Sequence, residues 1–283
     1  MTADMTGPTD VLSVDHVQKR YGAVLALRDV NLHLKDGEIL GLIGDNGSGK
    51  TTMLKILSGF HQATSGQMKL HGEPVVFRSV SAARHAGIEI VYQDLALVNG
   101  LSIAENVFLG RERYSGPLRT LTHRRMRKEA DEFLARLGLA NLPGMTEDVA
   151  NLSGGQRQAI ALARALYSQP KILHHDEPTA AMGPRETAQI LDLVRRLRDE
   201  QHVSILFVNH NYAQLLEVAD RVNLLRNGRI HFDKEVKDTS LEEITELVIS
   251  EVRRALARQT GLQVEGAQST SLSGATALAQ EVE

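Results

Sequence analysis

The sequence predicts an α/β protein, and the prediction rests on two glycine-rich stretches and on the short apolar runs beside them. Residues 44–51, G-D-N-G-S-G-K-T, fit the phosphate-binding pattern G-x-x-x-x-G-K-[ST]. Residues 152–156 read L-S-G-G-Q. In both stretches, glycines leave backbone N–H groups at the start of a helix open to an anion. We therefore expect alternating strands and helices with two anion-binding helix starts.

The phosphate-binding pattern stands in the order of elements that it requires. Residues 30–34 alternate apolar and polar side chains, which predicts a half-buried strand, and the apolar run 39–43 predicts a strand buried on both faces. A helix is expected over residues 51–57, with its apolar side chains on one face. This order favours a nucleotide-phosphate site over an ordinary glycine-rich turn.

The candidate ATP-binding residues of this loop are Gly44, Asp45, Asn46, Gly47, Ser48, Gly49, Lys50, Thr51 and Thr52. The pattern assigns Lys50 to the β- and γ-phosphates and the Thr51 hydroxyl to Mg²⁺. ATP and Mg²⁺ are therefore the expected cofactors.

Further candidate residues follow other apolar runs. The pair Asp176-Glu177 ends one run, and Gln93 and His210 follow two others. Successive strand side chains point to opposite faces, so the two carboxylates are expected to have different roles. Without the phosphate loop, the acidic pair would be an ordinary surface feature and the loop histidine a solvated one. Beside that loop, a role in catalysis is favoured.

Together these residues resemble the ATP-binding subunit of an ABC transporter over residues 11–232. The resemblance implies a P-loop NTPase (RecA-like) core with an antiparallel β subdomain and an α-helical subdomain. It also implies that Asp176 holds Mg²⁺ through water, Glu177 polarises the attacking water, His210 contacts the γ-phosphate, and Gln93 senses Mg²⁺ and water. The implied catalytic set is Lys50, Gln93, Glu177 and His210, and the implied Mg²⁺ set is Thr51, Gln93 and Asp176.

The resemblance carries two more assignments. Tyr21 matches the aromatic residue that stacks on adenine, although an aromatic side chain packing on a small sheet is a simpler alternative. The signature residues are Ser153, Gly154, Gly155 and Gln156, with Ser153 as a helix cap. In the family this helix start faces the phosphate loop of a partner subunit, which implies a two-fold homodimer with ATP at its interface. The alternative is a glycine-rich cap without a ligand.

Composition limits the other function classes. A net charge of −3 gives no sign of nucleic-acid binding or of contact with an anionic membrane surface. The absence of cysteine excludes a disulfide scaffold and thiolate metal sites, and it suits the cytosol. No apolar run approaches the roughly eighteen residues of a membrane span. Membrane contact is therefore expected only through a partner, at the cytoplasmic face.

One ATPase domain is expected, since the sequence shows no internal repeat. The predicted boundaries are a flexible N-terminus over residues 1–10, the ATPase domain over 11–240 with a helical subdomain over about 95–166, a C-terminal helix over 241–258 and a disordered tail over 259–283. Asn227-Gly228 predicts a hairpin turn. Residues 119–134 predict a charged amphipathic helix with a solvated face.

Several phrases resemble the monosaccharide-import branch of the family, namely residues 44–47, 91–97, 106–112 and 208–212. We therefore expect the ATP-hydrolysing subunit of an ABC importer, energising uptake of a sugar or polyol through a separate membrane permease. A solute-binding protein is then an indirect partner. The alternatives are a soluble ABC ATPase of cluster assembly or repair, and an importer or exporter ATPase for another solute.

Two features depart from the family pattern. His174 and His175 occupy normally apolar positions in the strand before Asp176. Adjacent strand residues point apart and are poor joint metal ligands, so we expect the pair to be structural, neutral and incompletely hydrogen-bonded. Residues 180–183 lack the aspartate common in the family, which puts the usual coupling between the two ATP sites in question.

Overall fold

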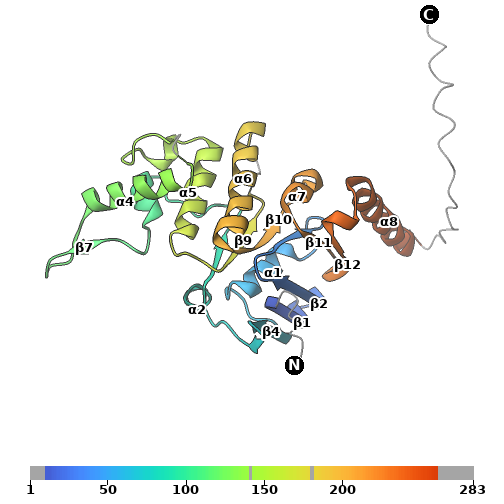
Figure 1. Ribbon diagram of the computed structural model, residues 1–283. Coiled ribbons are helices and arrows are strands. Elements are labelled where there is room, and N and C mark those ends of the chain that lie inside the picture. Colours follow the sequence, from blue (N-terminus) through green and yellow to red (C-terminus); the bar gives the residue numbers. More distant parts are fainter. Residues whose placement is uncertain (1–9, 140–141, 179–181, 261–283) are drawn as a thin grey trace, which may run out of the picture. The chain divides into compact units, whose positions relative to one another are not determined.

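The computed structural model describes residues 10–139, 142–178 and 182–260, and Figure 1 shows their helices and strands. The chain divides into two compact units, one ending at Thr239 and the other beginning at Ser240. The second unit holds helix α8 (Leu241–Thr260), where a C-terminal helix was expected. The predicted flexible N-terminus and disordered tail lie outside the described residues, except that Asp10 belongs to a strand and residues 259–260 to α8.

The strands are β1 (Asp10–Tyr21), β2 (Val24–Lys35), β3 (Ile39–Ile43), β4 (Ser65–Leu70), β5 (Glu73–Pro74), β6 (Ile88–Val91), β7 (Tyr114–Ser115), β8 (Thr120–Leu121), β9 (Ile172–Asp176), β10 (Ser204–Val208), β11 (Arg221–Arg226) and β12 (Arg229–Glu235). A six-stranded sheet has the order β12-β11-β3-β10-β9-β6, with only β12 antiparallel to its neighbour. An antiparallel sheet has the order β2-β1-β4-β5.

The central strands of the six-stranded sheet explain why the site forms where it does. Every residue of β3, β9 and β10 is buried, as expected of parallel strands covered on both faces. The strand predicted at 39–43 is thus confirmed, and the apolar run before His210 is strand β10. Parallel strands end at the same edge of a sheet, so the loops that follow β3, β6, β9 and β10 meet there.

The helices are α1 (Lys50–Leu57), α2 (Val80–His85), α3 (Ile103–Val107), α4 (His123–Arg136), α5 (Gly154–Leu166), α6 (Pro184–Gln201) and α7 (Tyr212–Val218), besides α8 and the short 3₁₀ turns η1 (Val149–Asn151) and η2 (Val236–Asp238). Within the residues described, no helix is both long and apolar enough to cross a membrane.

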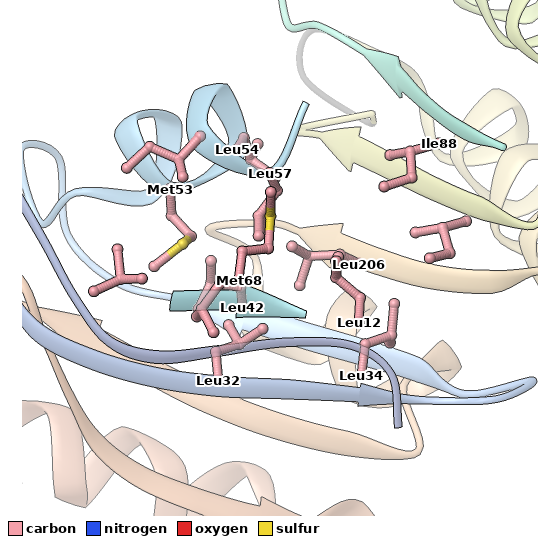
Figure 2. Packing of buried hydrophobic residues seen from close by; sticks show 14 of the residues in the cluster. Leu12, Leu32, Leu34, Leu42, Met53, Leu54, Leu57, Met68, Ile88 and Leu206 are labelled. Atoms are coloured by element: carbon pink, nitrogen blue, oxygen red, sulfur yellow. The ribbon is translucent and has the colours of Figure 1, made fainter. Parts of the chain in front are cut away.

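A hydrophobic core joins α1 to strands of both larger sheets (Figure 2). Met53, Leu54 and Leu57 of α1 are at most 1% exposed and pack with Leu32 of β2 and Leu42 of β3. The predicted apolar face of α1 is therefore confirmed. Each fully buried leucine contributes about 1.5–3 kcal/mol, so this packing fixes α1, and the loop before it, against the sheets.

One hairpin turn was predicted correctly, and a second hairpin was predicted as part of a helix. Asn227 and Gly228 have φ of 48° and 72° and join β11 to β12, which confirms the predicted hairpin turn. The helix expected from residue 119 begins only at His123. Arg119 has φ of 49°, which an α-helix does not accept, and lies between β7 and β8, a small hairpin that the sequence reading missed.

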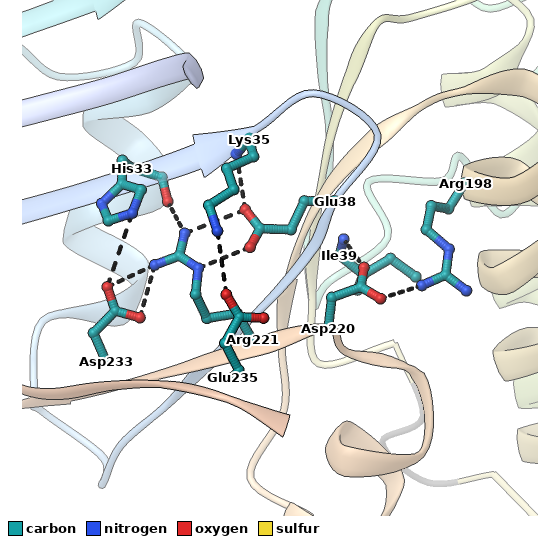
Figure 3. A network of polar contacts seen from close by, with 9 residues as sticks. All are labelled: His33, Lys35, Glu38, Ile39, Arg198, Asp220, Arg221, Asp233 and Glu235. Carbon is teal, nitrogen blue, oxygen red and sulfur yellow. Dashed lines mark hydrogen bonds and ion pairs between the residues drawn. The ribbon is translucent and has the colours of Figure 1, made fainter. Parts of the chain in front are cut away.

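A polar network ties the start of β3 to β11 and β12 (Figure 3). Arg221, 3% exposed, donates to Glu38 at 2.7 Å and to both carboxylate oxygens of Asp233 at 2.7 and 2.6 Å. Lys35 pairs with Glu235 at 3.2 Å. Because the buried charges of Arg221 and Glu38 are matched on several sides, the strand ends opposite the phosphate loop are held in register.

Candidate functional site

A cleft of about 710 Å³ lies at the carboxyl edge of the six-stranded sheet. Its lining residues are Ala26, Gly44, Asp45, Asn46, Gly47, Gly49, Lys50, Thr51, Thr52, Gln93, Glu177, His210 and Tyr212. The cleft thus brings the predicted phosphate loop together with three of the candidate residues that follow other strands. Ser48, Tyr21 and Asp176 are predicted site residues that do not line it.

The phosphate loop needs glycine at its two ends. Gly44 has φ of 156°, and a Cβ there would lie 2.1 Å from the Leu225 carbonyl oxygen. Gly49 has φ of 113°, and a Cβ there would lie 2.7 Å from Leu27 Cδ2. No side chain caps the start of α1 in the part of the chain described. The first N–H groups of α1 are therefore left for an anion such as a phosphate.

Lys50 lies inside the loop. Its side chain is almost buried, and Nζ donates to the carbonyl oxygens of Gly44 at 2.7 Å and Asp45 at 3.1 Å. Burial lowers the pKa of Lys50, and the charges of Glu177 and Asp176 oppose that shift. The ammonium group therefore stands between carbonyl oxygens and carboxylates, where a phosphate can add as a further charge-assisted partner.

Asp176 and Glu177 point in different directions because the backbone changes conformation between them, and not because strand side chains alternate. β9 ends at Asp176, which is 5% exposed, and burial followed by the charge of Glu177 raises its pKa to about 6. Glu177 leaves the strand with φ of 48°, and its N–H donates to the Val208 carbonyl at 2.9 Å. This uncommon conformation turns Glu177 into the cleft, within 3.6 Å of His210 Nδ1.

Gln93 is carried by a turn that Arg164 holds in place. Leu95 and Ala96, just after Gln93, have φ of 58° and 46°. Arg164, near the end of α5, donates to their carbonyl oxygens at 2.7 Å each. Nothing in the sequence reading pointed to this contact, because neither left-handed residue is a glycine.

The predicted Mg²⁺ set is compatible with the site. Thr51 and Gln93 line the cleft, and Asp176 lies behind it close enough to act on the pKa of Lys50. A hydroxyl, an amide oxygen and a carboxylate are ligands that Mg²⁺ accepts, together with water and phosphate. The described residues contain no cluster of three or more His, Cys, Asp or Glu side chains suited to a metal.

Two aromatic residues lie at or near this edge of the molecule, and the assignment of Tyr21 to the adenine stays a prediction. Tyr21 lies 40% exposed at the end of β1, in an edge contact with His61 and with Lys19 Nζ 4.9 Å from its ring. Tyr212 lines the cleft and was missed. Tyr212 could have been predicted to line the cleft, because it follows the candidate residue His210 by only two positions.

The signature residues lie at a different cavity. α5 begins with a capping box, in which Ser153 Oγ accepts from Gln156 N at 3.3 Å and Gln156 Oε1 accepts from Ser153 N at 3.0 Å. The predicted Ser153 cap is confirmed. Ser153, Gly155 and Gln156 line a cavity of about 340 Å³ with residues of α6. Of the stretch 180–183, residues 180–181 lie outside the described residues, and Met182 lines this cavity.

His174 and His175 are buried as expected. Both are 0% exposed, and burial lowers the pKa of each to about 3, so both are neutral. Among the residues that the structure describes, both ring nitrogens of His174 and Nδ1 of His175 have no hydrogen-bond partner. The exception is His175 Nε2, which lies 2.9 Å from Gln158 Nε2 on α5.

The fold and the cleft define the class of ATP-binding cassettes. A dimeric post-hydrolysis structure of the ATP-binding cassette MJ0796 with ADP and phosphate is 28% identical and superposes with a TM-score of 0.69, covering 80% of this chain and 98% of that one. A family profile described as ABC transporter matches residues 27–180. The chain belongs to the ABC transporter family.

Two curated relatives match over most of their lengths. The xylose/arabinose import ATP-binding protein of Sulfolobus acidocaldarius is 42% identical over 86% of this chain and 95% of that protein. The fructose import ATP-binding protein of Rhizobium meliloti is 44% identical over 77% of this chain and 86% of that protein.

Proposed function

We propose that this chain is the ATP-hydrolysing subunit of an importer that takes up a monosaccharide through a separate membrane permease. The observation that carries the proposal is the cleft that gathers Lys50, Gln93, Glu177 and His210 at one sheet edge. The likeness to the xylose/arabinose and fructose import proteins supports the sugar class. The subunit would act at the cytoplasmic face of the membrane, with a solute-binding protein as an indirect partner.

Five residues of the cleft, and Asp176 behind it, have defined tasks in this proposal. Lys50 and the open N–H groups of α1 hold the β- and γ-phosphates. Thr51, Gln93 and Asp176 would hold Mg²⁺, which neutralises charge on the phosphates when bound. Glu177 accepts a proton from the attacking water, and His210, beside it, contacts the γ-phosphate. Placing these groups before reaction is the main source of rate in phosphoryl transfer.

The signature residues suggest a homodimer. Ser153 and Gln156 lie at their own cavity and do not line the phosphate cleft of the same chain. In a two-fold dimer, the start of α5 in one subunit would close the ATP site of the other. The dimeric cassette structure with ADP and phosphate supports this arrangement.

Sugar uptake by the source organism tests the proposal. We expect deletion of the gene to abolish uptake of at least one of labelled xylose, arabinose, fructose and ribose. The wild-type gene should restore that uptake and Glu177→Gln should not, because an amide cannot accept the proton. The purified protein should also bring down a membrane permease. Normal uptake of all four sugars after deletion would reject the sugar class, and co-purification with only soluble partners would favour a non-transport ATPase.

A further inference from the structure

The β7–β8 hairpin and the first turns of α4 form a surface that the proposed ATPase site does not use. We call residues 113–128 the hairpin surface. Its six cationic residues are Arg113, Arg119, Arg124, Arg125, Arg127 and Lys128, and it contains no Asp or Glu. The whole chain, by contrast, carries a net charge of −3. Positive charge is therefore concentrated here against the sign of the molecule.

Apolar side chains stand out on the same hairpin. Leu118 is 87% exposed, Leu121 is 45% exposed and Tyr114 is 43% exposed. The Arg119 guanidinium lies 5.0 Å from the centre of the Tyr114 ring. Figure 1 shows the hairpin extending away from α4. Since water opposes the exposure of clustered apolar side chains, such a tip suggests a contact surface.

Not all of the cations are neutralised within the chain. Arg113 and Arg125 both pair with Glu129, at 3.1 and 2.6 Å. Lys128 lies 3.8 Å from Glu132. Arg119 and Arg124 have no ion pair among the residues that the structure describes, whereas Arg127 is close enough to Glu105 to help lower the pKa of that carboxyl. The hairpin surface thus carries two guanidinium groups, those of Arg119 and Arg124, that no described carboxylate pairs with.

We propose that the hairpin surface binds directly to the anionic headgroups of a lipid bilayer. Leu118 and Leu121 enter the boundary between headgroups and acyl chains, and Arg119 and Arg124 contact lipid phosphates. Tyr114 suits the same boundary, because its ring is apolar and its hydroxyl is polar. The proposal goes beyond the proposed function and rests on it only for the presence of a membrane nearby.

A bilayer fits this surface better than an acidic protein segment does. A protein partner would need a hollow shaped to receive a protruding leucine, whereas a bilayer admits one anywhere on its surface. The sequence predicts membrane contact only through a partner, because no apolar run is long enough to span a bilayer and the net charge of −3 gives no sign of contact with an anionic surface. The hairpin surface can nevertheless contact a bilayer directly, because its local charge is positive. At ordinary salt concentration electrostatic attraction decays within about 10 Å, so the negative charges elsewhere on the chain are screened.

Vesicle flotation with the full-length protein tests the proposal. Vesicles of equimolar phosphatidylcholine and phosphatidylglycerol should carry the protein, and vesicles of phosphatidylcholine alone should not. Arg119→Gln with Arg124→Gln should weaken binding about 25-fold, taking about five-fold for each cation at an anionic surface. Leu118→Ser should weaken it about ten-fold. Raising the salt concentration should release the protein.

Matched variants keep the test specific. Lys171→Gln with Lys237→Gln removes two exposed lysines elsewhere, and Val76→Ser removes an apolar side chain that is 70% exposed. Both should bind vesicles as the wild type does. Binding that the hairpin variants leave unchanged, or no binding to anionic vesicles, would overturn the proposal. ATPase activity measured in the same samples separates this failure from failure of the proposed function, since the hairpin lies outside the cleft.

Discussion

Replacing His174 by leucine should make the folded protein more stable. Both ring nitrogens of this side chain are buried without a partner. An unsatisfied buried polar group costs about 1–3 kcal/mol, and leucine has no such group. Because a unit of this size melts about 2–4 °C higher for each kcal/mol gained, the change is measurable by calorimetry. Fluorescence or circular dichroism during denaturant unfolding gives the free energy directly.

His175→Leu is the matched comparison. It also removes an unpartnered nitrogen, but it takes away the contact that Gln158 Nε2 makes with His175 Nε2 at 2.9 Å. The buried amide of Gln158 is then left without that partner, which offsets the gain. We therefore expect the free energy of unfolding to rise clearly for His174→Leu and little for His175→Leu.

The pH dependence gives an independent check. The pKa of His174 is about 3 in the folded protein and about 6.5 in the unfolded chain. As pH falls through 6.5, His174 binds a proton in the unfolded chain but stays neutral in the folded protein. The free energy of unfolding of the wild type therefore falls. Between pH 7 and pH 5.5 one such histidine costs about 1.3 kcal/mol. Asp176 titrates in both proteins, so its effect cancels to first order in the comparison.

The advantage of His174→Leu should therefore widen by about 1.3 kcal/mol at the lower pH. An advantage that stays constant between the two pH values would show that His174 can be protonated, or is bonded, in the folded protein. A variant less stable than the wild type at both values would refute the packing argument as well.

Changes at four further positions test the ATP site. Glu177→Gln should keep ATP binding and lower kcat about 10²–10⁴-fold, with an ATP-stabilised dimer visible by light scattering; wild-type turnover would remove Glu177 from its role. Lys50→Ala should weaken ATP binding, whereas Ser153→Arg should leave binding by the monomer intact and block hydrolysis. Normal hydrolysis by Ser153→Arg would contradict the two-chain site. Arg164→Ala should lower kcat about ten- to hundred-fold at unchanged ATP affinity, with faster amide exchange in residues 93–96. Arg164→Lys should keep part of the activity, and equal exchange in all three proteins would exclude the positioning role.

The sequence predicts those parts of the fold in which local pattern and tertiary packing agree. The apolar run 39–43, the glycine loop and the face of α1 all require one arrangement, and the structure has it. Asn227-Gly228 was recognisable because both residues accept positive φ in a two-residue turn.

The features that escaped prediction depend on contacts between distant segments. The left-handed pair Leu95-Ala96 contains no glycine, and Arg164, far along the chain, donates to both of its carbonyl oxygens. The contact between Gln158 and His175 likewise joins a helix to a strand. The β7–β8 hairpin did carry a local signal in Gly116, but the basic residues around it resembled a helix face.

The hydrogen bonds from Arg164 to the turn after Gln93 link that turn to the movement of helix α5. Helix α5 is a rod of 13 residues, about 20 Å long, with Ser153 at one end and Arg164 close to the other. If α5 tilts as a rigid body, both of its ends move. A displacement at Ser153 would then also shift the carbonyl groups of Leu95 and Ala96, which are hydrogen-bonded to Arg164. The left-handed region costs a non-glycine residue about 1–2 kcal/mol, so the two hydrogen bonds from Arg164 offset part of that cost at Leu95 and Ala96. In a homodimer, a force that the partner subunit applies at Ser153 would thus reach Gln93 through α5 and Arg164. No direct contact between the two nucleotides would be needed.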